Sequence, residues 1–206
     1  MARRKRDPDT TPIPDRILQA ATKLLSVEGY ENTSMKSIAA EADITAGALY
    51  YHFANKQDIV FRVLEQAIGA LTVACKAAVE IDRDDPVAAL RDFVAAHVNH
   101  HLDQLHVIAP VYSALVYGAR RRNDLLSEEQ SMRLRELERE HFTTLHGIVI
   151  AGVKRGVLCS KDTKLDCFSI IGMCEHVVNW ANPKGKLRPG QIADRVADQA
   201  VRMLSC

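Results

Sequence analysis

The stretch from residue 33 to residue 60 constrains the fold most, because it contains the signals for two short helices separated by a tight turn. Thr33 or Ser34 can cap a helix that runs to about residue 42, and Thr45 can cap a second helix that ends near residue 53. Asp43 falls in the turn, and Asp is one of the few residues other than glycine that tolerate a left-handed backbone conformation. The small core that would hold both helices at a fixed angle comes from Ile38, Ala39, Ala42, Ile44 and Leu49.

Helical periodicity continues along the rest of the chain, and no stretch alternates between apolar and polar residues as a strand would. Gly29 ends the first helix as a left-handed cap would, Asn55 can cap the fourth helix, and Ser127 with Gln130 forms a capping box. We therefore predict an all-α protein with about nine helices. The expected helices with the clearest ends cover residues 15–28, 33–42, 45–53, 55–79, 87–104, 127–155, 162–181 and 189–204, and an apolar segment lies at 107–118.

The best candidate for a domain junction is the charged stretch 82–85 followed by Pro86. Residues 1–14 contain four consecutive basic residues, Arg3 to Arg6, and are expected to form a flexible basic arm. Residues 15–60 are expected to form a helix-turn-helix domain, whose fourth helix continues to about residue 80 as a connector. Residues 81–206 then form a larger helical domain. The hydrophobic fraction of 47% and the charged fraction of 26% are ordinary for a globular protein, so composition alone selects no function.

Several classes of protein are excluded by what the sequence lacks. Five cysteines, an odd number without a CxxC pair, argue against a secreted disulfide framework. No apolar region follows the basic N-terminus, and no apolar stretch reaches about 18 residues, so we expect no signal peptide and no membrane span. A reducing cytoplasm fits best. No nucleophile elbow, phosphate-binding loop, HExxH motif or dinucleotide-binding glycine run occurs, so we expect neither an enzyme nor a cofactor.

The helix that follows Thr45 has the side chains of a DNA-reading helix. Its first residues, 46–48, are small, which lets the backbone approach phosphates or base edges, and residues 50–52 offer hydroxyl and imidazole groups to phosphate oxygens. The net charge of residues 15–58 is negative, so a positive field must come from helix dipoles, from Lys36 and Lys56, and from the basic arm. The arm would either follow the phosphates or the minor groove of the DNA, or remain a disordered solubilising tail. The expected DNA contacts are Thr33, Ser34, Lys36, Thr45, Ala46, Gly47, Tyr50, Tyr51, His52 and Lys56.

These contacts divide into two expected roles. Thr45, Tyr51 and Lys36 are candidates for reading bases, whereas Ser34, Tyr50, His52 and Lys56 are candidates for contacting phosphates. Tyr51 has an alternative, which is to pack on the neighbouring helix.

The same stretch resembles the N-terminal domain of the TetR family of regulators. That family's pattern of Thr-Thr, Ile-Ala, Ala-Gly-Val-Ser, Gly, Leu-Tyr, His-Phe and Lys is matched in spacing by Thr33-Ser34, Ile38-Ala39, Ala42-Asp43-Ile44-Thr45, Gly47, Leu49-Tyr50, His52-Phe53 and Lys56. Two positions depart from it: Asp43 stands where Gly is common, and Met35 where a basic or polar residue often faces the DNA backbone.

The resemblance implies a homodimer that binds double-stranded DNA at a palindromic operator and is released by a small-molecule effector. An alternative is an architectural, nucleoid-associated factor that needs no effector, and activation instead of repression also stays open. The two last helices would pair with a symmetry mate, although their apolar faces could equally belong to the chain's own core. The expected interface residues are Ile170, Cys174, Val177, Val178, Ile192, Val196, Ala200 and Met203.

The effector pocket is expected between residues 87 and 180. His97 and His101 lie four residues apart, a spacing that could chelate a metal, but a histidine on an apolar face is more often a pocket or core residue, so no metal site is predicted. The expected pocket residues are Phe93, His97, His101, Tyr112, Leu115, Tyr117, Leu137, His141, Phe142, Leu145, His176 and Trp180.

The C-terminal segment from Gly172 to Asp194 resembles a subgroup of the same family that responds to acyl-CoA thioesters. In that subgroup a Trp ends the penultimate helix and a Pro/Gly loop leads into Ile-Ala-Asp, which correspond here to Trp180 and to residues 192–194. An acyl-CoA or another lipid-like compound is therefore a candidate effector. Its phosphates could meet the cluster Arg120–Arg122, or Lys184, Lys186 or Arg188, although the arginine cluster could equally be a solvated loop.

Overall fold

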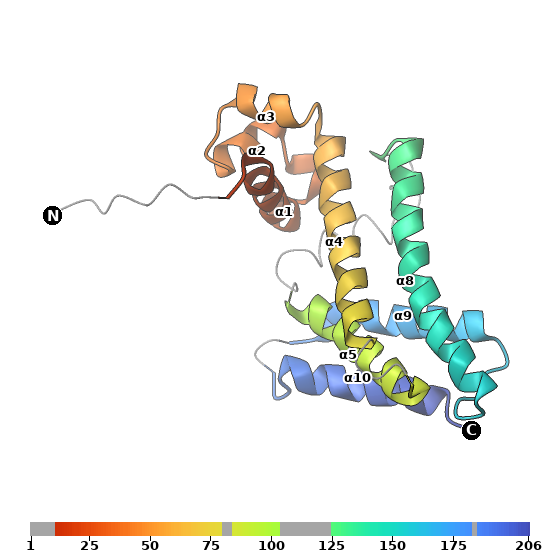
Figure 1. Cartoon of the computed structure of the whole chain (residues 1–206). Coiled ribbons are helices and arrows are strands. Elements are labelled where there is room, and N and C mark those ends of the chain that lie inside the picture. Colours follow the sequence, from red (N-terminus) through yellow and green to blue (C-terminus); the bar gives the residue numbers. More distant parts are fainter. Residues whose placement is uncertain (1–10, 80–83, 104–124, 183–184) are drawn as a thin grey trace.

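A computed structural model describes residues 11–79, 84–103, 125–182 and 185–206 of the chain. Over this part of the chain all regular secondary structure is helical, which confirms the predicted all-α class (Figure 1). The eight helices are close in number to the predicted nine, and the apolar segment 107–118 lies outside the described residues. The helices are α1 (Ile13–Asn32), α2 (Met35–Glu41), α3 (Ala46–His52), α4 (Lys56–Val79), α5 (Pro86–Asp103), α8 (Glu128–Lys154), α9 (Thr163–Trp180) and α10 (Pro189–Met203).

The helix ends follow the local signals in the sequence. Asn55 Oδ1 accepts a hydrogen bond from Asp58 N–H in the first turn of α4, and Ser127 forms with Gln130 the expected capping box of α8. Gly29 adopts a positive φ of 75°, as expected of a left-handed cap, but the chain resumes a helical turn after it, so α1 ends at Asn32, four residues later than predicted.

The buried residues form two hydrophobic clusters. The first cluster joins α1, α2, α3, the first half of α4 and the first part of α8, and it includes Ile17, Ile38, Leu49 and Ile59. The second cluster surrounds α5, which packs against α4, α8, α9 and α10. Figure 1 accordingly shows α3 at one end of the molecule and α10 at the other.

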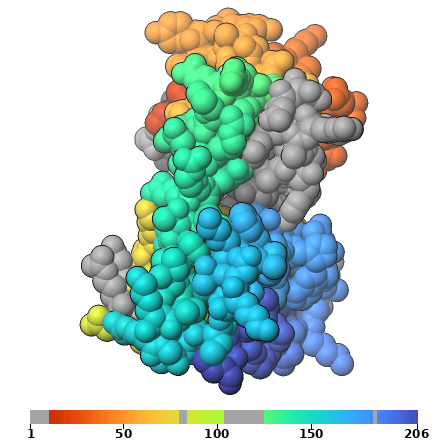
Figure 2. Space-filling model, turned by 90° about the vertical axis from the view of Figure 1, so that its right-hand side faces the viewer, coloured from red at the N-terminus to blue at the C-terminus, as the bar shows by residue number. Residues whose placement is uncertain are grey.

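Helices α4 and α8 belong to both clusters and so connect the two ends of the molecule. On α4, Ile68 lies in the first cluster and Cys75 in the second; on α8, Leu137 lies in the first and Leu145 in the second. Figure 2 shows α8 along the surface from the N-terminal helices to the C-terminal ones. The two helices are also tied by Gln130 with Asp58, Arg133 with Glu65, and Lys76 with Glu140.

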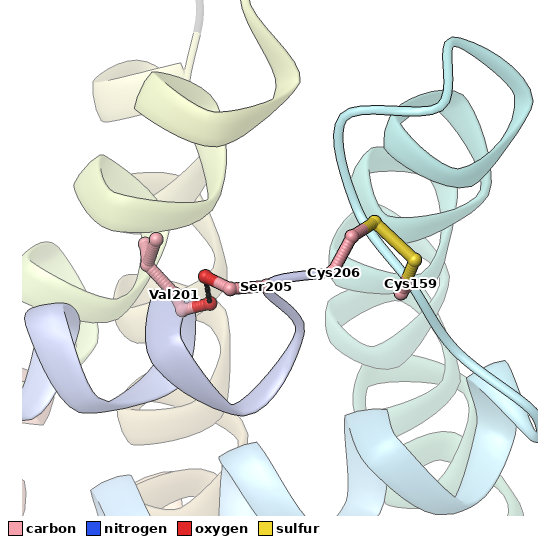
Figure 3. The surroundings of a disulfide bond; sticks show 4 residues. All are labelled: Cys159, Val201, Ser205 and Cys206. Carbon is pink, nitrogen blue, oxygen red and sulfur yellow. Dashed lines mark hydrogen bonds between the residues drawn. A yellow bond between two sulfur atoms is a disulfide. The ribbon is translucent and has the colours of Figure 1, made fainter.

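The end of the chain is held by a disulfide bond between Cys159 and Cys206, 47 residues apart (Figure 3). Next to it, Cys159 N–H donates a hydrogen bond of 2.7 Å to the Leu204 carbonyl. Neither the odd number of cysteines nor their spacing indicated this pair, because only the fold brings the C-terminus to the segment that follows α8. The other three cysteines are free and buried.

No helix within the described ranges combines the length and the apolar character that crossing a bilayer would need.

Candidate nucleic-acid interface

The turn between α2 and α3 has the predicted left-handed geometry. Asp43 has φ of 54° and is the one described residue other than glycine with a positive φ. Arg16 of α1 donates hydrogen bonds to the carbonyls of Ala42 (2.6 Å) and Asp43 (3.1 Å), so a distant guanidinium holds this turn in place. Sequence reasoning missed Arg16, since nothing local marks it as a partner of the turn.

The residues at the start of α2 serve the helix itself. Ser34 forms a capping box with Ser37: its Oγ accepts from Ser37 N–H, and its own N–H donates to Ser37 Oγ. Thr33 is only 1% exposed and donates its hydroxyl to the Gly29 carbonyl at 2.8 Å. Thr33 is therefore withdrawn from the predicted DNA contacts, because its side chain is buried and already bonded.

Helix α3 is anchored on one face and open on the other. Leu49 is fully buried and Phe53 is 8% exposed, whereas Tyr50 is 56% exposed and Tyr51 is 85% exposed. Tyr51 therefore does not pack on a neighbouring helix; it extends into solvent, with the His52 ring against its edge. Thr45, Ala46 and Gly47 are exposed as well, and Thr45 Oγ1 caps the helix by accepting from Ala48 N–H.

Lys56 has partners inside the domain. Its ammonium donates hydrogen bonds to the carbonyls of Tyr30 (2.7 Å) and Thr33 (2.8 Å), and it lies 3.9 Å from the centroid of the Tyr30 ring. Lys23 is similarly engaged, in an ion pair with Glu41. Of the lysines and arginines in residues 15–58, all within the described ranges, Lys36 alone has no bonded partner, which makes it the cation most available to DNA.

Six of the predicted pocket residues are buried in the interior of the larger domain or at its border with the first cluster. His97 is fully buried, with its Nδ1 3.2 Å from Nε2 of His141, and the ring of His101 packs 4.7 Å from that of His97. The Phe93 ring lies 5.0 Å from that of His141, measured between centroids. Phe142 instead stacks on Phe168, on another side of α8. The six buried residues are Phe93, His97, His101, Leu137, His141 and Leu145.

Burial disfavours the charged form of these histidines. It lowers the pKa of His101 and of His141 to about 4, with His100 as a further cause in both and His141 as a third cause for His101. The pKa of His97 is also lowered well below its ordinary value, first by burial and then by the neighbouring histidines. Cys75 of α4 lies next to them, and burial raises the pKa of its thiol to about 12. The sequence did not indicate Cys75, because only the packing of α4 on α5 brings it there.

Two predicted pocket residues lie elsewhere. His176 is exposed and contacts Asn179 on its own helix, and Trp180 is 53% exposed at the end of α9, so neither lines an interior pocket. Tyr112, Leu115, Tyr117 and the cluster Arg120–Arg122 lie outside the described residues, as do Arg3–Arg6 and Lys184.

The predicted dimer interface also needs correction. Six of its eight side chains are at most 8% exposed within one chain and so offer a partner little surface: Ile170, Cys174, Val177, Ile192, Val196 and Ala200. They belong to the chain's own core, which is the alternative that the sequence left open. Val178 is half-buried and Met203 is 42% exposed. The large apolar side chains that α9 does expose are Leu165 (61%), Phe168 (63%) and Trp180 (53%).

A helix-turn-helix with one anchored and one open helical face, joined by a long helix to a larger helical domain, defines a class of DNA-binding regulators. The comparison with protein families agrees: residues 17–63 match the bacterial regulatory proteins of the tetR family, and residues 83–204 match the tetracyclin repressor-like C-terminal domain. The chain belongs to the TetR family of DNA-binding transcriptional regulators, and it is not an enzyme.

Individual relatives are distant. The chain is 27% identical over 143 residues to the transcriptional repressor NicS of Pseudomonas putida, a match that covers 69% of this chain and 64% of that protein. It is 42% identical over 52 residues to the regulator HbdR of Aromatoleum, of which the match covers 23%. These matches therefore span less than two thirds of the curated relatives.

Solved structures match nearly the whole chain. The TetR-family regulator PfmR of Thermus thermophilus superposes with a TM-score of 0.78 at 29% identity, over 91% of this chain and 98% of that one. AibR, solved with isovaleryl coenzyme A and operator DNA, superposes with a TM-score of 0.77 at 24% identity, over 94% and 98% of the two chains. The second likeness shows the fold alone.

Proposed function

We propose that this regulator is a homodimeric repressor that binds a palindromic operator through the open face of α3 and is released by a small-molecule effector. The observation that carries the proposal is the exposure of Tyr50 and Tyr51 on a helix whose opposite face is anchored by Leu49 and Phe53. Two exposed tyrosines on one short helix bury useful contact area and offer hydroxyl groups to phosphates and bases.

The exposed residues of the N-terminal domain support two separate roles among the remaining contacts, one to base edges and one to phosphates. Thr45, Ala46, Gly47 and Tyr51 face outward at α3 and are the candidates for base edges, together with Lys36 on α2. The candidates for phosphate contacts are Tyr50, the half-buried His52, and the N-terminus of α2 at Ser34. Lys56 acts indirectly, by fixing the backbone at Tyr30 and Thr33 from which α2 starts.

The proposed dimer uses the exposed face of α9. Leu165, Phe168, Gly172, His176 and Trp180 follow one another at three- and four-residue spacing, so they lie on one stripe of the helix. An exposed apolar stripe of this length is costly in water unless a partner covers it. A symmetric partner would set two copies of α3 at a spacing of roughly 34 Å, one turn of DNA.

The proposed effector acts in the larger domain and changes the position of α3 through α4. Helix α8 is bonded to α4 through Gln130, Arg133 and Glu140. A ligand that shifts α8 against α5 would therefore also shift α4, and with it the helix-turn-helix that directly precedes α4. An acyl-CoA or lipid-like compound is the candidate, on the resemblance of residues 172–194 to acyl-CoA-responsive regulators. AibR, the neighbour solved with isovaleryl coenzyme A, has a similar fold.

Selection of bound fragments from the organism's own genome, followed by footprinting, tests the DNA half of the proposal. We expect a palindromic footprint with half-sites about one helical turn apart. Protection that spreads over unrelated sequences would favour the architectural alternative. Titrating the operator complex with acyl-CoAs of increasing chain length tests the effector half, and no release at any length would refute that candidate. Phe168→Glu should convert the dimer to monomer in sedimentation, and an unchanged dimer would place the interface elsewhere.

A further inference from the structure

The structure assigns a second ligand to the interior of the larger domain: we propose that Cys75, His97 and His141 form a binding site for a divalent transition-metal ion, with Zn²⁺ as the best fit. The three residues come from α4, α5 and α8, and all three are buried. The Cys75 Sγ and one ring nitrogen of each histidine all lie within 4.8 Å of one another. The ligands of a tetrahedral zinc ion lie roughly 3.5 Å apart, so small side-chain rotations would close the site.

Unused hydrogen-bonding groups supply a second, independent observation. The single contact between the two histidines uses His97 Nδ1 and His141 Nε2. His97 Nε2 and His141 Nδ1 are buried and have no hydrogen-bond partner among the described residues. A buried polar atom without a partner is costly, and an ion or an ordered water is the usual explanation for one in a folded protein. The two rings that carry these atoms contact each other, and both rings have a nitrogen near the Cys75 thiol.

The donor set selects the class of ion. One thiolate and two imidazoles suit zinc and its neighbours among the transition metals, whereas Mg²⁺ and Ca²⁺ require oxygen ligands. An imidazole binds a metal through an unprotonated ring nitrogen, and each of the two histidines has one to offer. Binding at Cys75 releases the thiol proton to solvent as the sulfur–metal bond forms. Three protein ligands leave a fourth position for water or another donor, as in zinc sites that accept exogenous ligands.

The position of the site allows a bound ion to affect the DNA-binding domain through α4. Cys75 lies on the helix that begins beside the helix-turn-helix, and His141 lies between the α8 residues Leu137 and Leu145, which belong to different hydrophobic clusters. An ion held by both helices and by α5 would fix α4 relative to α8. This consequence rests on the proposed function, whereas the site itself does not.

Spectroscopic titration with Co²⁺, followed by competition with Zn²⁺, tests the site in the full-length chain without an affinity tag. The background is the double variant Cys159→Ser, Cys206→Ser, so that reduction of the disulfide bond cannot add two exposed thiols as competing ligands. We expect one ion per chain, with the charge-transfer absorption of a thiolate–cobalt bond. That absorption should vanish in Cys75→Ala, and Co²⁺ should bind at least about tenfold more weakly to His141→Asn. Two matched controls, Cys167→Ser and His146→Asn, should leave the charge-transfer absorption and the affinity for Co²⁺ unchanged.

The background protein alone decides whether the site binds Co²⁺ through a thiolate, even if one of the further variants fails to fold. Absence of thiolate–cobalt absorption in it would overturn the proposal, and so would absorption that persists in a folded Cys75→Ala protein. Operator affinity is then measured with and without Zn²⁺. If the ion binds but leaves this affinity unchanged, the link to DNA is overturned and the site stands. If no operator is found at all, the proposed function fails while the metal result is unaffected.

Discussion

Replacing Lys56 with Met separates two roles that the sequence could not distinguish. The substitution keeps the apolar stem and removes the ammonium, so the carbonyls of Tyr30 and Thr33 lose their donor and the Tyr30 ring loses its cation. A charge-assisted hydrogen bond contributes about 1.5–3 kcal/mol, and an exposed cation–π contact about 0.5–1 kcal/mol. Because Lys56 is only half-buried, water replaces part of this, and we expect a loss of about 3 kcal/mol in the free energy of unfolding.

Equilibrium urea unfolding, followed by circular dichroism at a fixed protein concentration, measures this loss. Lys36→Met is the matched control. Lys36 is exposed and unpaired, so its loss should leave the free energy of unfolding unchanged, whereas operator affinity should fall by about 1–3 kcal/mol, because Lys36 is a candidate for reading a base edge. The reasoning is refuted if Lys56→Met keeps the stability of the parent protein and instead lowers the slope of log affinity for DNA against log salt, because Lys56 would then contact phosphate directly.

Three further tests concern the left-handed turn, the disulfide bond and the packing of a buried glycine. Asp43→Ala should lower the free energy of unfolding by about 1 kcal/mol, and Asp43→Gly should not lower it, because only glycine adopts the φ of 54° without strain; equal losses would contradict this. Reducing the disulfide bond, or replacing Cys159 and Cys206 with Ser, should cost up to about 4 kcal/mol in chain entropy for a separation of 47 residues, and urea midpoints that agree with and without reductant would argue against that contribution. Gly152→Ala should cost about 1–3 kcal/mol, because its Cβ would lie 2.6 Å from Cγ of the buried Leu158, whereas Gly147→Ala meets nothing within 4 Å and should be tolerated; a thermal melt compares the two.

Local signals were sufficient to predict the helices and the turn. Ser34, Thr45 and Ser127 cap helices because a side-chain oxygen can reach a backbone N–H three residues later, which depends on sequence alone. The left-handed turn at Asp43 was predictable for the same reason. The open face of α3 was predictable in part, since Leu49 and Phe53 had to be buried for two such short helices to hold together.

The roles that depend on distant neighbours were not predictable. Lys56 looked like a phosphate contact because nothing in its local sequence shows that two carbonyls lie within reach. Ile170 and Val196 looked like interface residues because an apolar stripe has the same pattern whether it faces a partner or the chain's own α5. The approach of Cys75 to His97 and the pairing of Cys159 with Cys206 arise from tertiary packing, which spacing along the chain does not encode.

The affinity of Tyr51→Ala for the operator tests the central claim most directly. Tyr51 is 85% exposed and makes no contact that the fold depends on, so its removal should leave the free energy of unfolding unchanged. We expect operator affinity to fall at least about tenfold, which corresponds to about 1.4 kcal/mol, while Val73→Ala, exposed on α4 and away from α3, keeps full affinity. Unchanged affinity in Tyr51→Ala would contradict the account, because it would mean that the open face of α3 is not the surface that reads DNA.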